Sequence, residues 1–154
     1  MSANEAERST RTDRIVGVVL AVGLAAVAAV QVFWTLGGTW GVHAASGGVY
    51  EEVTTALRVQ SAFAAVLFVA GCLVALARVG LWTAPVSFRL VRIGAWVLTV
   101  ALWLGALVNV AAPTNWERFG NGSVALVLAI LALVVARAGR EHRVHLPRAL
   151  RPSH

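Results

Sequence analysis

The stretch IVGVVLAVGLAAVAAVQVFWTLG, residues 15–37, contains no charged side chain. An α-helix rises 1.5 Å per residue, so about 20 apolar residues cross the roughly 30 Å hydrocarbon core of a bilayer. Three further apolar runs follow, at residues 58–77, 93–112 and 122–136. The four runs predict an all-α integral membrane protein built as a four-helix bundle.

Composition and charge agree with a membrane protein. Hydrophobic residues make up 58% of the 154 residues and charged residues only 13%, and the mean hydropathy is +0.76. These values lie outside the range of soluble domains. The net charge of +6 would fit nucleic acid if it were spread over a folded surface, but the arginines cluster at the ends of the apolar runs. We therefore expect the lipid bilayer, and no nucleic acid, as a partner.

The arginines also predict an orientation, because basic residues near helix ends stay on the cytoplasmic side. All but two of the 13 basic residues lie in the N-terminal segment, the loop between the second and third runs, or the C-terminal tail. The two other connections carry only Arg58 and Arg118, beside Glu51, Glu52 and Glu117. We expect two transmembrane hairpins with both termini inside the cell (N-in, C-in).

The same pattern divides the chain into a cytoplasmic segment 1–14, a membrane domain 15–137 and a basic cytoplasmic tail 138–154. A cleaved signal peptide is the alternative for the first run, since residues 26–28 loosely resemble a small-residue cleavage site. The run is longer than the 7–15 residues of a signal peptide's apolar region and follows mixed charges, which favours a retained first helix.

Small residues in the first run predict where that helix packs. Gly17, Ala21, Ala25 and Ala29 recur every four residues, and such stripes let helix backbones approach closely in lipid. We expect this stripe inside the bundle. Shorter pairs with the same spacing occur in the second and third runs: Gly71 with Ala75, and Ala101 with Gly105.

Polar residues within the runs gather toward the expected outer side. Gln31 lies about two turns below the end of the first run, and Asn109 about one turn below the end of the third. Polar groups at membrane depth need partners, so both are candidate ligand contacts, although interhelical hydrogen bonds would satisfy them equally. Trp34 and Trp103 lie at similar depth and either line an aromatic pocket with these amides or fill the core.

The two outer connections hold the remaining candidates. His43, in the Gly-rich first connection, could form a general acid/base or metal site with Glu51 and Glu52, or lie on a solvated loop. His142 and His145 lack a third metal ligand nearby. Neither a catalytic motif nor a nucleotide-binding fingerprint is present. We therefore expect no metal and no cofactor, and we name no catalytic residue.

Two segments carry a resemblance to a known family: FWTLGGTWG at residues 33–41, followed by His43, and NWERFG at residues 115–120. On these segments the chain resembles the small bacterial four-helix membrane proteins catalogued as domain of unknown function 3995. The likeness covers most of the chain between residues 15 and 137. It implies a four-span architecture in a bacterial cell membrane, without a defined activity.

These observations favour a small binding or sensing module that holds a lipid-like or small apolar ligand at the outer ends of its helices. Alternatives are a structural or partner subunit, or a homo-oligomer. An enzyme or transporter is less favoured, because no Asp, Glu, His or Arg lies near the middle of any run. The candidate ligand-binding residues are Gln31, Trp34, Gly37, Gly38, Trp40, His43, Asn109, Trp116, Glu117 and Arg118.

Overall fold

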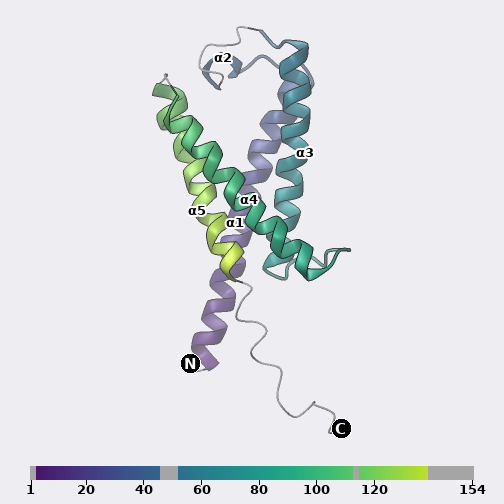
Figure 1. Cartoon of the computed structure of the whole chain (residues 1–154), viewed down its shortest axis with the longest axis vertical. Helices are drawn as coiled ribbons and strands as arrows, with labels where there is room; N and C mark the ends of the chain where they lie inside the picture. The colour runs from purple at the N-terminus through teal and green to yellow at the C-terminus, as the bar shows by residue number, and fades with distance from the viewer. Residues whose placement is uncertain (1–2, 46–51, 113–114, 139–154) are drawn as a thin grey trace.

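The computed structural model describes residues 3–45, 52–112 and 115–138, which contain helices and no strand. Within these residues, four helices are long and apolar enough to cross a membrane, as Figure 1 shows. The prediction of an all-α chain with four such helices is confirmed. Three of them are α1 (Ala3–Thr35), α3 (Thr55–Arg78) and α4 (Phe88–Val110). The fourth span, Glu117–Ala138, combines the π-helix η1 (Trp116–Asn121) with α5 (Gly122–Ala138). A short helix α2 (Val42–Ala45) lies between α1 and α3.

The first helix begins well before its apolar run. α1 starts at Ala3 rather than at residue 15, because residues 3–14 include neither glycine nor proline and are rich in Ala, Glu and Arg, which favour helix. The predicted N-terminal segment is therefore helical from residue 3 onward. Residues 139–154 of the predicted tail lie outside the described residues.

Glycines end α1 and α3 in the same way. Gly37 and Gly80 adopt positive φ angles of 96° and 74°. The N–H of Gly37 donates to the carbonyl of Trp34, and the N–H of Gly38 donates to the carbonyl of Phe33. These two bonds form a Schellman motif, which satisfies the last carbonyls of the helix. The chain therefore turns sharply at the Gly-Gly pair.

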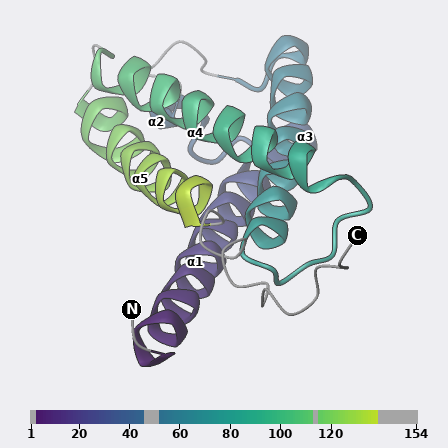
Figure 2. The same cartoon turned by 60° about the horizontal axis from the view of Figure 1, so that its bottom comes forward.

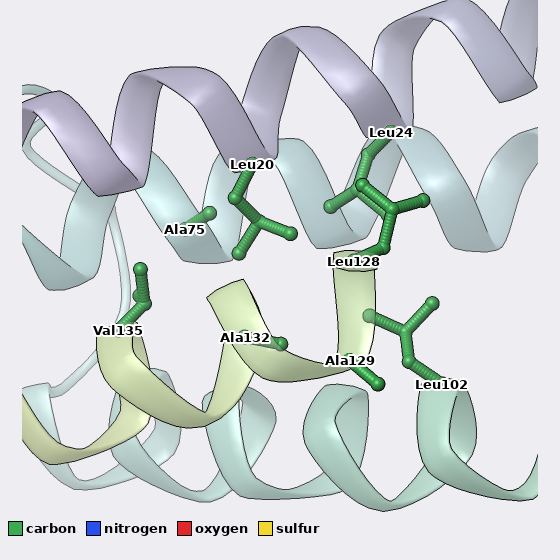
Figure 3. Close-up of a cluster of buried hydrophobic side chains, with 8 residues drawn as sticks. All are labelled: Leu20, Leu24, Ala75, Leu102, Leu128, Ala129, Ala132 and Val135. Atoms are coloured by element: carbon green, nitrogen blue, oxygen red, sulfur yellow. The ribbon is translucent and has the colours of Figure 1, made fainter. Parts of the chain in front are cut away.

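The helices pack as two pairs, α1 with α3 and α4 with α5. The pairs meet where Leu20 and Leu24 of α1 pack against Leu128 and Val135 of α5, as Figure 3 shows. Many apolar side chains outside this cluster point outward; Phe63, for example, is 70% exposed. Outward apolar side chains are what helices need when lipid surrounds them.

The small-residue stripe of α1 is buried only in part. Gly17 and Ala21 face the core, but Ala25 and Ala29 are exposed. The prediction was wrong for these two residues because four residues rotate an α-helix by about 40° more than one full turn, so the stripe drifts off the core face. Among the shorter pairs, Gly71 and Ala75 are buried, whereas Ala101 is exposed and Gly105 is half-buried.

A buried arginine joins the two pairs at the end of the bundle where α3 finishes. Arg78 is only 5% exposed, and its Nη2 donates to the carbonyl oxygen of Ala136 in α5 over 3.2 Å. Its guanidinium carbon lies 5.2 Å from the centre of the Phe88 ring at the start of α4. Arg78 therefore contacts both helices of the α4–α5 pair from the end of α3.

Candidate functional site

A cleft of about 310 Å³ lies between the two pairs, toward the end of the bundle that carries α2 and η1, called the α2 end below. At Gly23 the helices α1 and α5 approach closely, since an added Cβ would lie 2.6 Å from a terminal methyl carbon of Leu128. Beyond this point the pairs diverge (Figure 1). The cleft is lined by Val27, Val30, Gln31 and Trp34 of α1, Phe68 of α3, Leu102 and Asn109 of α4, Asn121 of η1, and Val124, Ala125 and Leu128 of α5.

The contact between α1 and α5 bounds the cleft on one side. On the other side, farther from the α2 end, the contact between α3 and α4 bounds it. An added Cβ on Gly71 would lie 3.1 Å from Leu98, and one on Gly94 would lie 3.3 Å from Val74. Figure 2 shows α4 starting beside α3 and leaning away from it toward η1. The lean separates α4 from α3 toward the α2 end, where the cleft lies.

Gln31 lines the cleft with a side-chain amide whose hydrogen-bonding groups are unused among the described residues. It is half-buried, and its main-chain carbonyl accepts a hydrogen bond from Thr35 Oγ1 over 2.8 Å. Within the described part of the chain, its side-chain amide has no hydrogen-bond partner. An unpaired amide in apolar surroundings costs about 1–3 kcal/mol. The amide is therefore available to a molecule in the cleft.

Two further side-chain amides, those of Asn109 and Asn121, also line the cleft. Asn109 Nδ2 donates to the carbonyl of Gly105 over 2.8 Å, one turn back on its own helix. This bond lies within α4 and does not bridge two helices. Asn121 was not among the predicted site residues, although Trp116, Glu117 and Arg118 of the same connection were. The π-helix η1 packs against the end of α4 and brings Asn121 to the cleft wall.

Trp34 forms part of the wall and fastens the segment that follows α1. Its Nε1 donates to the main-chain oxygen of Trp40 over 3.0 Å. Trp40 is 79% exposed, and a tryptophan suits the membrane interface. Trp103 packs against the core cluster, which agrees with the interpretation that it fills the core. Trp34 instead lines the cleft.

The two arginines at the α2 end cap helices. Arg58 Nε donates to the carbonyl of Thr35, the last residue of α1, over 2.9 Å. Arg118 Nη2 donates to the carbonyl of Ala112, just beyond α4, over 3.1 Å. Carbonyls at helix C-termini carry the negative end of the helix dipole, which favours a cation there. Neither arginine lines the cleft.

Four further predicted residues do not line the cleft. Gly37 and Gly38 end α1, and a side chain at Gly38 would overlap the ring of Phe33. His43 is exposed on α2, and Glu117 is half-buried in η1. Trp116 belongs to η1, but its side chain is not among those described. The structure thus gathers Gln31, Trp34 and Asn109 in one cleft. Outside its lining are Gly37, Gly38, Trp40, His43, Glu117 and Arg118.

No group of three or more His, Cys, Asp or Glu side chains in the described ranges is placed to hold a metal ion. Glu51, one of the residues considered with His43, lies outside those ranges. No family model, curated protein or solved structure matches the chain, so membership of the family catalogued as domain of unknown function 3995 stays a prediction.

Proposed function

We propose that the protein is a multi-pass protein of a bacterial cell membrane that binds a small lipid-like or apolar ligand in the cleft. The unpaired Gln31 amide carries this proposal, because it lies at membrane depth in a cleft whose other walls are largely apolar. Ligand sites combine such apolar walls with a few polar groups that orient the ligand. The four apolar helices support the membrane location.

We further propose two transmembrane hairpins, N-in and C-in, which would place the α2 end outside the cytoplasm. The arginine distribution supports this orientation. In a Cys72→Ala background, we expect Thr39→Cys to react with a membrane-impermeant maleimide on intact cells and Thr83→Cys to remain unlabelled. Both threonines are exposed and lie in connections at opposite ends of the bundle. The reverse labelling pattern would contradict the orientation.

Gln31→Leu tests the binding proposal. It removes the amide while keeping a side chain of similar size, and we expect it to lower ligand retention about fivefold, as loss of one hydrogen bond does. Native mass spectrometry from mild detergent measures the retained mass and its stoichiometry.

The matched control is Gln60→Leu, the same change at an exposed position of α3 that does not line the cleft. We expect it to retain the adduct. Equal retention by both variants would place the ligand elsewhere. A protein without any adduct, in mild detergent and after lipid supplementation, would favour a structural or partner subunit instead.

A further inference from the structure

At the α2 end, residues 36–45, which follow α1 and include α2, lie beyond the cleft. Helix α2 contacts η1, and its Val42 is only 3% exposed. The Trp34–Trp40 hydrogen bond fastens the preceding segment to the cleft wall. Figure 1 shows α2 between the ends of the two helix pairs. A molecule entering from the water at this end would have to pass these residues.

The cleft is open on the side where α1 and α5 diverge. Val30 of α1 and Val124 of α5 both line it, yet they are 37% and 52% exposed, respectively. Lining residues that are also exposed lie at the rim of a cleft. Both belong to helices that are apolar enough to span a membrane, so in a bilayer we expect the rim to face acyl chains.

The lining also restricts the chemistry of a ligand. None of the lining residues is charged, and Arg58 and Arg118 donate to main-chain carbonyls nearby. A charged head group would be stripped of water without gaining a counter-ion, which is strongly unfavourable. A primary amide such as Gln31 both donates and accepts, so it matches a hydroxyl or amide head.

The size of the cleft limits the ligand further. Its volume of about 310 Å³ lies at the lower end of the roughly 300–1,000 Å³ found for pockets that hold drug-sized ligands. One head group and part of one chain fit this space, and the open side lets the rest of the chain remain in lipid.

We propose that the cleft takes its ligand from the bilayer, through the gap between α1 and α5 flanked by Val30 and Val124. The ligand is an uncharged, single-chain amphiphile whose head hydrogen-bonds Gln31. This inference rests on the proposed function and specifies the class of ligand and its route. Entry from lipid and a neutral head are separate claims, and each has its own test.

The first test concerns the head group. The full chain in phosphatidylcholine nanodiscs is exposed to a long-chain primary alcohol with a diazirine on its chain, then irradiated and mapped by peptide mass spectrometry. We expect saturable labelling of α1 and α5 near the cleft, about fivefold weaker in Gln31→Leu and unchanged in Gln60→Leu. A quaternary ammonium probe with the same chain should label these peptides far less. Equal or stronger labelling by the ammonium probe would overturn the neutral-head claim.

The second test concerns the route. Val124→Trp narrows the gap, whereas Val127→Trp makes the same change at a neighbouring exposed position of α5, 55% exposed, that does not line the cleft. We expect Val124→Trp to slow labelling by the alcohol several-fold and Val127→Trp to leave it unchanged. Equal labelling rates would overturn entry between α1 and α5 while leaving binding in the cleft intact. No saturable labelling by either probe in the unaltered protein would overturn both this inference and the proposed function.

Discussion

Replacing Arg78 with Met is expected to lower the free energy of unfolding by about 2–4 kcal/mol. The change removes a charged donor from the carbonyl of Ala136, a type of bond that contributes about 1.5–3 kcal/mol. It also removes the cation above the Phe88 ring, which adds about 0.5–2 kcal/mol. Met keeps an unbranched apolar chain in place, so the loss reports mainly on the guanidinium.

Thermal unfolding in mild detergent measures this effect. Arg89→Met is the matched control, because Arg89 is exposed at the start of α4 and its replacement should leave the unfolding temperature nearly unchanged. An equal shift in the two variants would show that the buried arginine does not join the helix pairs.

Gly17→Ala is expected to destabilise the protein by about 1–3 kcal/mol, as overpacking of a tight contact does. The new Cβ would lie 2.6 and 2.8 Å from the two γ-carbons of Val79, and 3.2 Å from its β-carbon. Valine is branched at Cβ and has restricted rotamers, so rotation cannot clear both methyl groups. Relief requires α1 to shift relative to the end of α3.

Gly105→Ala is the control for this prediction, because no heavy atom lies within 4 Å of its added Cβ. In the middle of a helix it should be neutral or stabilise by about 0.5–1 kcal/mol, since alanine favours helix over glycine. Unfolding in mixed micelles with increasing SDS measures both variants. Similar destabilisation of both would contradict the close packing at Gly17.

The sequence predicts the spanning helices well, because few structures other than a membrane-spanning helix suit a long uninterrupted apolar run. It also placed Gln31, Trp34 and Asn109 near the same end of the bundle, and the structure brings these three into one cleft. This worked because a polar or large aromatic side chain inside an apolar run is conspicuous, and because the helix direction fixes its depth.

Other features depend on geometry that composition does not encode. Asn121 could not be predicted to line the cleft, because a π-helical turn changes which residues face inward. Ala25 and Ala29 were misplaced because a four-residue spacing drifts around the helix. Arg78 was counted only as a charge at a helix end, and a count cannot tell whether its side chain points to water or back into the bundle.

The three arginine–carbonyl bonds have a mechanical consequence. Arg58 and Arg118 each fasten segments of the same pair, whereas Arg78 ties one pair to the other at the far end. Away from the α2 end the two pairs are therefore held together by Arg78 and by the core cluster that contains Leu20 and Leu24. Near the α2 end the two pairs are bridged by the contact between α2 and η1. Separating the pairs at the α2 end would therefore require the four-residue helix α2 to move, whereas the bond from Arg78 to Ala136 could stay in place.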